Sequence, residues 1–207
     1  MVMFAFGMAQ IVAGWTRGSA TAYYFSYFVN PAAVEGVFFN WIDASFGNFL
    51  VAGTIASIIG MLFAKPLCRI FGAKLLMAGL SVLVALFTAG FWFLTAEQTG
   101  LMFALHIAGS LVGGPIPVLL WAMYADVADY SEWKNNRRAT GLVFAAATFS
   151  QKMGGAIGGA IPAWCLYYFS FVQPIDGVAQ VQSTTTLNGI VAMMSIIPAA
   201  FLVLTAL

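Results

Sequence analysis

The chain alternates between long apolar runs and short polar segments. The apolar runs cover approximately residues 3–28, 46–64, 75–95, 101–125, 140–169 and 187–207. Each run is close to or longer than the ~20 residues that an α-helix needs to cross the hydrocarbon core of a bilayer. The pattern therefore predicts an all-α integral membrane protein, a bundle of six transmembrane helices.

Composition agrees with this pattern. Hydrophobic residues make up 62% of the chain and charged residues 7%. Soluble domains contain ~25% charged residues, so this chain has too few polar groups to face water. The first run is too long for a signal peptide and contains Gln10, Arg17 and Thr21, so we expect it to remain in the mature protein. The eight lysines and arginines form no basic stripe, which excludes nucleic acid as a partner.

Charge is concentrated in residues 125–141, between two apolar runs. This segment holds six of the fifteen Asp, Glu, Lys and Arg residues of the chain. Acids spaced three residues apart come first and bases follow, so the segment can form its own ion pairs at a helix end. The six residues are Asp126, Asp129, Glu132, Lys134, Arg137 and Arg138. We interpret the segment as lying at a membrane boundary.

The distribution of basic residues predicts the orientation. The loops after the second and fourth runs carry Lys and Arg, whereas the other three loops carry none. Because cytoplasmic loops are enriched in basic residues, both ends of the chain are predicted to be cytoplasmic. Cys68 then lies on the inner side and Cys165 near the outer side, much farther apart than the ~7 Å limit for a disulfide. We expect neither a disulfide nor a Cys/His metal site.

Two basic residues lie inside predicted spans. A Lys or Arg at membrane depth costs at least ~2.5 to 3.5 kcal/mol on insertion scales. Arg17 and Lys152 are therefore expected to face a water-filled cavity or a polar partner rather than lipid. For Arg17 a structural role, pairing with helix ends, stays open. Lys152 has a hydroxyl and an amide beside it, on Thr148 and Gln151, which suit a polyhydroxylated ligand.

Polar residues recur at helical spacing in three of the runs, which predicts a shared aqueous cavity. His106, Trp121 and Tyr124 also have ordinary interpretations, as helix-packing or interfacial residues. The stripe of the first run contains Gln10, Gly14, Arg17, Thr21 and Tyr24; that of the fourth contains His106, Ser110, Gly114, Pro117, Trp121 and Tyr124; that of the fifth contains Thr148, Gln151, Lys152, Gly155 and Gly159.

Glycine and proline predict where helices pack closely or bend. Residues 154–159 contain two overlapping pairs of small residues, 154 with 158 and 155 with 159, which permit close contact with a neighbouring helix. Pro115, Pro117, Pro162 and Pro198 are expected to interrupt three of the spans. Such bends occur in carriers and also as static kinks.

Three segments resemble one transporter family. The run W-A-M-Y-A-D-V-A-D-Y-S-E-W-K-N-N-R-R-A-T-G-L-V-F-A-A-A-T-F-S-Q-K, from Trp121 to Lys152, resembles the tenth-to-eleventh helix region of the glycoside-pentoside-hexuronide:cation symporters, the melibiose-carrier-like branch of the major facilitator superfamily. Residues 22–27 resemble the seventh helix of that family, and residues 65–74 resemble its inner loop between helices eight and nine.

The resemblance covers essentially the whole chain, as the C-terminal six-helix half of a twelve-helix transporter. It implies secondary active transport of a sugar, glycoside or hexuronide in the inner cell membrane, coupled to symport of Na⁺ or H⁺ and working by alternating access. The coupling cation would be bound mainly by acids of the N-terminal half, and no other cofactor is implied. The chain begins inside an apolar run and ends without a basic flank, so we expect a fragment or split-gene half whose partner is the missing half.

The resemblance also implies roles for individual residues. Thr148, Gln151 and Lys152 would contact sugar, and an inner gate would consist of Asp126, Asp129, Arg137 and Arg138. Where some relatives carry a sugar-stacking tryptophan this chain has Pro117, so Tyr23, Tyr24 or Trp121 would have to substitute. The full set of substrate-binding candidates is Arg17, Thr21, Tyr24, Trp121, Thr148, Gln151 and Lys152. Arg17 would suit a hexuronide carboxylate.

Other functions are weighed against this one. The chain has no nucleophile paired with a base and no H-E-x-x-H motif, which argues against an enzyme. It has no repeated pore loop, which argues against a channel. A carrier of lysolipids or other amphiphiles and a non-transporting partner subunit remain as alternatives.

Overall fold

The computed structural model describes residues 2–29, 45–136, 140–175 and 180–206. Regular structure in these residues is helical, without a β-strand, which confirms the all-α prediction. The helices are α1 (Val2–Tyr23), the π-helical turn η1 (Tyr24–Phe28), α2 (Phe46–Leu62), α3 (Ala64–Phe71), α4 (Ala73–Gly90), the 3₁₀ turn η3 (Phe91–Phe93), α5 (Thr99–Gly113), α6 (Pro115–Asn135), α7 (Thr140–Tyr168), α8 (Thr184–Met194) and α9 (Ile196–Leu204).

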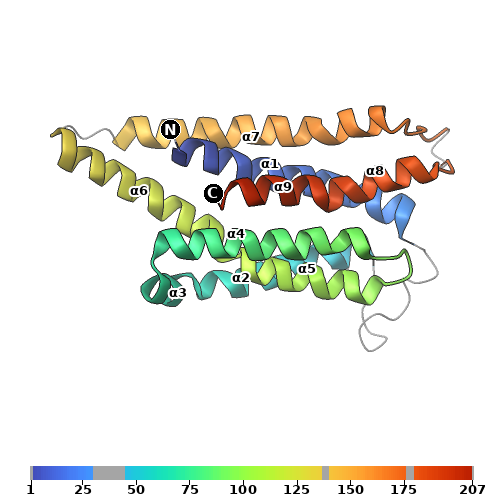
Figure 1. Cartoon of the computed structure of the whole chain (residues 1–207), viewed down its shortest axis with the longest axis horizontal. Helices are drawn as coiled ribbons and strands as arrows, with labels where there is room; N and C mark the ends of the chain where they lie inside the picture. The colour runs from blue at the N-terminus through green and yellow to red at the C-terminus, as the bar shows by residue number, and fades with distance from the viewer. Residues whose placement is uncertain (1, 30–44, 137–139, 176–179, 207) are drawn as a thin grey trace.

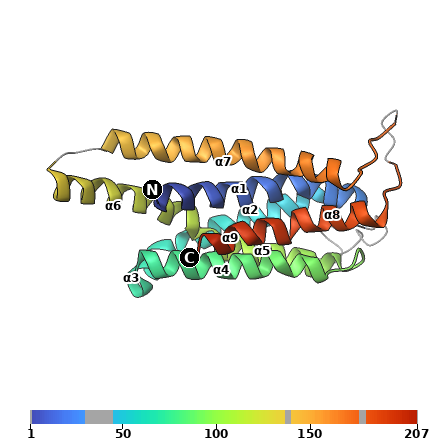
Figure 2. The same cartoon turned by 45° about the horizontal axis from the view of Figure 1, so that its top comes forward.

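The helices form an elongated bundle (Figure 1). In both views α7 lies along α1, while α4 and α5 run together on the opposite side of the molecule (Figure 2). Helix α9 lies between these groups because it packs on both α1 and α4. The last turns of α6 and the first turns of α7 project beyond the rest of the bundle.

Three of the short breaks between consecutive helices precede a proline. The break between α2 and α3 falls at Phe63, shortly before Pro66, and bends the chain by 50°. The break between α5 and α6 falls directly before Pro115, and that between α8 and α9 falls shortly before Pro198. Proline lacks the N–H that would bond to the carbonyl four residues earlier, and its ring collides with that carbonyl. These prolines therefore explain the breaks.

Two predicted boundaries differ from the structure. Pro162 was expected to interrupt its span, but α7 runs continuously through it for 29 residues. The segment after residue 125 was expected to be a loop, but α6 continues to Asn135. Within this extension the Lys134 ammonium lies 5.8 Å from the centroid of the Tyr130 ring, four residues before it, a contact between neighbours on one side of a helix.

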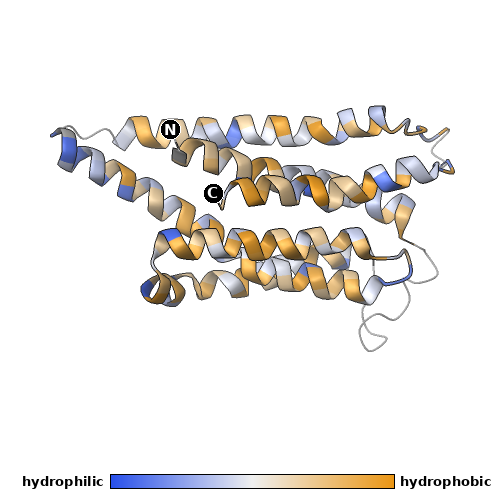
Figure 3. Ribbon diagram, viewed as in Figure 1, coloured by the Kyte–Doolittle hydropathy of each residue, from blue (hydrophilic) through white to orange (hydrophobic). Residues whose placement is uncertain are grey.

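Hydropathy places the bundle in a membrane. Ala73–Phe93, Thr99–Lys134 and Thr184–Leu204 are long and apolar enough to cross one, and the bent pair α2 and α3 adds a fourth segment if it forms a single span. Helix α1 has 22 residues, so at ~1.5 Å per residue it is as long as the ~30 Å hydrocarbon core. In Figure 3 hydrophilic residues gather on α3 and on the outer turns of α6, at the same end of the bundle.

Buried side chains form two main clusters along the length of the bundle. One surrounds Phe49 and Phe91 and includes Tyr24 and residues of α8. The other surrounds Leu119 and Tyr124 and includes residues of α4 and α7. Between them the polar side chain of Gln10 links α1 to α4 and to the end of α9. Its Nε2 donates to Ser81 Oγ at 2.8 Å and to Thr205 Oγ1 at 3.1 Å.

Candidate functional site

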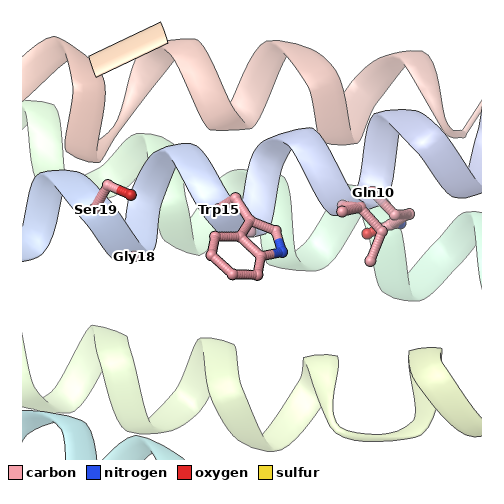
Figure 4. A pocket seen from close by; sticks show the side chains of 6 residues that line it. Gln10, Trp15, Gly18 and Ser19 are labelled. Atoms are coloured by element: carbon pink, nitrogen blue, oxygen red, sulfur yellow. The ribbon is translucent and has the colours of Figure 1, made fainter. Parts of the chain in front are cut away.

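A groove of about 430 Å³ runs along one face of α1. Its volume lies within the ~300–1,000 Å³ range of small-molecule sites. The lining residues are Gln10, Ile11, Gly14, Trp15, Gly18 and Ser19. Figure 4 shows the indole of Trp15 standing out from α1, between Gln10 on one side and Gly18 and Ser19 on the other.

Two glycines shape the floor of this groove. A Cβ atom added to Gly14 or Gly18 would meet nothing within 4 Å, so the absence of side chains there leaves the groove open. The Trp15 side chain is 55% exposed and forms a flat apolar wall. Gln10 and Ser19 supply polar groups at the other positions. The groove therefore combines one aromatic face with a few hydrogen-bonding groups, as ligand sites commonly do.

Trp15 connects this groove to α7. Its Nε1 lies 3.5 Å from the position that a Cβ of Gly155 would take, so the indole edge is in van der Waals contact with α7. Residues three and four apart on a helix are surface neighbours, so Lys152 and Gln151 flank this contact. Thr148 and Lys152 are exposed. The Thr148 hydroxyl donates to the Phe144 carbonyl at 2.9 Å, which leaves its oxygen free to accept a bond.

A second groove, of about 470 Å³, lies between the ends of α1 and α7. It is lined by Tyr23, Tyr27, Ala163, Leu166, Tyr167, Phe171, Gln173 and Pro174. Tyr23 and Tyr27 both make edge-to-face contacts with Phe171, with ring centroids 5.7 and 5.1 Å apart. An aromatic groove thus follows the first one along the helix pair, toward the η1 end of the bundle.

Of the predicted stripe on the first helix, Arg17, Thr21 and Tyr24 face the interior of the bundle. Arg17 directs its guanidinium to α4 and η3, where Nη1 donates to Thr88 Oγ1 at 3.5 Å. Thr21 and Tyr24 are buried, and Tyr24 is 0% exposed. Gly14 was predicted to share this stripe but is exposed. Gln10 and Gly14 of the same stripe line the groove, whereas Arg17, Thr21 and Tyr24 are turned away from it and contact α4, α8 and η3.

The polar stripe of the fourth predicted span also lies apart from the groove. His106 stacks on Phe49 of α2, with ring centroids 3.8 Å apart. Trp121 is 42% exposed and stacks on Phe144 of α7, while Tyr124 is buried beside it. The structure therefore separates the predicted cavity residues into an α1–α7 face, an interior cluster and an aromatic group on α6.

The predicted inner gate is described only in part. Asp126 and Asp129 are exposed on α6, in the region where hydrophilic residues gather at one end of the bundle (Figure 3). Their predicted partners, Arg137 and Arg138, lie outside the described residues. Both cysteines are free, Cys68 in α3 and Cys165 in α7. No group of metal-binding side chains occurs in the part of the chain that the structure describes.

Sequence reasoning missed Trp15 and Ser19. A signal was present, because Gly14 and Gly18 are spaced by one helical turn around an aromatic residue. That spacing is usually taken as a helix-packing motif. In the structure the packing contacts are made by Gly154 and Gly158 of α7, and Gly14 and Gly18 of α1 are left open.

Comparison with known proteins gives consistent matches. The model of the family described as MFS/sugar transport protein matches residues 1–207. The inner membrane symporter YicJ of Escherichia coli is 28% identical over 96% of this chain and 40% of its own length. The putative glycoside/cation symporter YagG of the same organism is 32% identical over 84% of this chain and 37% of its own. The isoprimeverose transporter of Lactiplantibacillus pentosus is 28% identical over 84% of this chain and 33% of its own.

The chain thus spans about two fifths or less of the length of these curated relatives. The matched relatives are transporters, and the resemblance noted in the sequence is confirmed at the level of the family.

Proposed function

Because the chain belongs to the MFS/sugar transport protein family, we propose that it forms the C-terminal six-helix half of a secondary transporter for a sugar, glycoside or hexuronide. The family and the relatives matched above are membrane transporters and not enzymes. The helical arrangement supports a six-span half if α1 and η1, α2 and α3, α4 and η3, α5 and α6, α7, and α8 and α9 each form one span.

The observation that carries the proposal is the α1–α7 face. The open groove beside Trp15 places an aromatic ring against α7 at Gly155, three residues after the exposed Lys152, and the exposed Thr148 lies one turn before Lys152. A pyranoside has the complementary surfaces, an apolar face of C–H groups and a rim of hydroxyls. The ring would lie on the indole, and the hydroxyls would bond to Lys152, Thr148 and Gln151. Arg17, Thr21 and Tyr24 would support this face from within the bundle.

Transport is proposed to work by alternating access together with a second six-helix half. The exposed face of α7 and the groove on α1 would then line the space between the halves. Coupling to Na⁺ or H⁺ would depend mainly on acids of the other half, because the acidic residues described here are all exposed, three of them in the second half of α6 and Glu97 before α5. Both ends of this chain would be cytoplasmic, together with the basic residues of α3 and α6.

Uptake of labelled glycosides tests the function. Vesicles would contain this chain alone or this chain joined to an amino-terminal six-helix half of a glycoside symporter. We expect cation-dependent uptake of a pyranoside by the joined protein and none by the chain alone. Uptake by the chain alone would refute the need for a second half.

A matched pair of variants tests the site. Trp15→Ala is expected to abolish saturable pyranoside uptake by the joined protein, whereas Trp121→Ala removes an exposed tryptophan outside the groove and is expected to preserve it. Transport of a lysophospholipid but no pyranoside would favour the amphiphile carrier. Wild-type uptake by Trp15→Ala would refute the groove as the sugar site.

A further inference from the structure

Helices α3 and α4 meet in a junction that combines basic and apolar side chains, at one end of the bundle (Figure 1). The candidate membrane span of α4 begins at Ala73, so Lys74 lies at its start. Lys65, Arg69 and Lys74 are all exposed. Residues 44–96, which include α2, α3 and α4, contain these three bases and no acid. The junction therefore carries positive charge at the edge of a predicted span.

Helix α3 has one face toward the bundle and one toward its surroundings. Ala64 is buried, and Leu67 and Cys68 pack against the core that α4, α6 and α7 share. Ile70 and Phe71 are 73% and 53% exposed. Exposed apolar side chains beside basic ones are typical of a helix at a membrane interface, where the apolar groups enter the acyl region and the charged ends reach the headgroups.

A groove of about 380 Å³ lies at the junction. Gly72 makes the turn between the two helices with a φ of 74°, a conformation that glycine adopts readily. Its N–H donates to the Cys68 carbonyl at 2.9 Å, and its carbonyl accepts from the Leu76 N–H at 3.1 Å. This turn fixes the start of α4 directly after α3. The groove is lined by Phe71, Gly72, Ala73, Lys74, Leu75 and Ala78.

An exposed apolar stripe continues from the groove along α4. Leu75, Val82 and Leu86 are 67%, 40% and 64% exposed, and Gly79 between them is exposed as well. Their spacing of four, three and four residues places them on one side of the helix. Helix α4 runs on the side of the molecule opposite α7 in both views (Figure 1, Figure 2). The stripe is therefore available to lipid, away from the α1–α7 face that is proposed to adjoin a second half.

The described acids do not neutralise the bases of the junction. Among the residues that the structure describes, no ion pair joins Lys65, Arg69 or Lys74 to an acid. The described acids lie before α5 and in the second half of α6. A negatively charged partner from outside the chain would complement this surface, as anionic lipids do at basic segments beside a membrane span.

The apolar lining of the groove favours a lipid over other anions. Five of its six lining residues have no polar side chain, and Lys74 supplies the one charge. Inorganic phosphate or an acidic protein segment would pair with Lys74 and leave the apolar lining exposed. A phospholipid has both parts, a charged headgroup for the lysine and an acyl chain that covers the apolar surface.

We propose that the junction of α3 and α4 binds an anionic phospholipid of the surrounding membrane, such as phosphatidylglycerol. The phosphate would lie at Lys74, and an acyl chain would follow the groove and the stripe along α4. Lys65 and Arg69, which belong to the same surface, would add attraction for the negative headgroup. The site uses no residue of the α1–α7 face, so it is independent of the proposed sugar site.

Lipid binding to the purified chain tests the proposal. Native mass spectrometry in detergent would compare phosphatidylglycerol with phosphatidylcholine of the same acyl chains. We expect phosphatidylglycerol to bind more tightly, because only its headgroup carries a net negative charge. Glycerol phosphate, the soluble part of the headgroup, should not displace the lipid at equal concentration, since it cannot cover the groove.

Variants locate the site. Lys74→Gln should weaken phosphatidylglycerol binding about fivefold, the contribution of one basic residue near an anionic lipid. Lys74→Arg should retain the wild-type affinity. Lys134→Gln is the matched control, because Lys134 is an exposed base at the same end of the bundle that lies over the Tyr130 ring and outside the groove. This control should bind phosphatidylglycerol as the wild type does.

Three outcomes would overturn the proposal. Equal affinities of the wild type for the two lipids would remove the preference for a negative headgroup. Equal losses in Lys74→Gln and Lys134→Gln would show diffuse attraction by any base at this end of the bundle. Full displacement by glycerol phosphate would show a site for a free anion. Since both lysines are exposed, wild-type melting temperatures are expected for all variants, so that a loss of binding is not a loss of folding.

Discussion

The hydroxyl of Thr16 on α1 donates a hydrogen bond to the backbone carbonyl of Gly158 on α7, at 3.2 Å. Gly158 lies four residues before Pro162, so its carbonyl has lost the N–H that would bond to it in a regular helix. A free carbonyl at membrane depth is tolerated when a neighbouring helix satisfies it. Thr16 meets this need, and α7 therefore continues through Pro162 without a break.

Replacing the hydroxyl should destabilise the bundle. Thr16→Val keeps the shape of the side chain but leaves the buried Gly158 carbonyl unsatisfied, for which we expect a loss of ~1–3 kcal/mol in the free energy of unfolding. Thr54→Val is the control, because its hydroxyl is exposed and bonds only to Leu50 of its own helix. Chemical unfolding in mixed micelles measures both. Equal losses in the two variants would contradict the role given to Thr16.

The close approach of α7 to α1 should depend on one glycine of an adjacent pair. A Cβ added at Gly158 would lie 2.8 Å from the Val12 carbonyl oxygen and 2.9 Å from the Trp15 Cβ, whereas one added at Gly159 would meet nothing within 4 Å. Gly158→Ala should lower the free energy of unfolding by ~1–3 kcal/mol through overpacking. Gly159→Ala should be neutral or slightly stabilising, since alanine is the better helix former. A larger loss at Gly159 would contradict the observed packing.

The glycines of residues 154–159 show how much of the helix packing could be predicted from the sequence. The sequence predicted two equivalent small-residue pairs in residues 154–159. Only the pair of Gly154 and Gly158 faces α1 closely, and choosing between the pairs requires the rotation of α7 about its axis. Helix existence and approximate limits follow from hydropathy, because they depend on local residues. Rotation depends on contacts with residues far away in the chain.

The same limitation explains why the candidate site was predicted only in part. A spacing of three, four and seven residues correctly places Arg17, Thr21 and Tyr24 on one stripe, but the spacing does not tell whether that stripe faces a cavity or the core. The structure turns it toward Thr88 and Phe91. Trp15 was missed because one exposed aromatic residue in an apolar run has no periodic signal of its own.

The two native cysteines provide a test of orientation. Cys68 lies in α3, at the end of the bundle where hydrophilic residues gather, and Cys165 lies near the end of α7, toward the opposite end (Figure 1). Both are partly exposed. If α3 is cytoplasmic, a membrane-impermeant maleimide should modify Cys68 only in inside-out vesicles and Cys165 only in right-side-out vesicles. Cys68→Ser and Cys165→Ser identify each signal, and the reverse pattern would refute the orientation.

The acids of α6 should affect transport more than folding. Asp129 is exposed, and partly exposed ion pairs contribute only ~0–1 kcal/mol to stability. As part of the proposed inner gate, Asp129→Asn should slow pyranoside uptake by the joined twelve-helix protein, while its melting temperature and membrane insertion stay close to those of the wild type. Glu97→Gln, at an exposed acid outside α6, is the control. Normal uptake together with poor expression would assign Asp129 to folding.

Lys152 should contribute directly to sugar affinity. Its side chain is exposed on the face of α7 that adjoins Trp15, and Thr148 lies one turn before it. A hydrogen bond to a charged group contributes ~1.5–3 kcal/mol, so Lys152→Ala should weaken pyranoside binding by ~10- to 100-fold. Met153→Ala changes the neighbouring exposed residue of α7 and should have little effect. Titration calorimetry on the joined protein gives both affinities. Because no buried contact is lost, Lys152→Ala should retain the wild-type melting temperature, and unchanged affinity would remove Lys152 from the proposed sugar site.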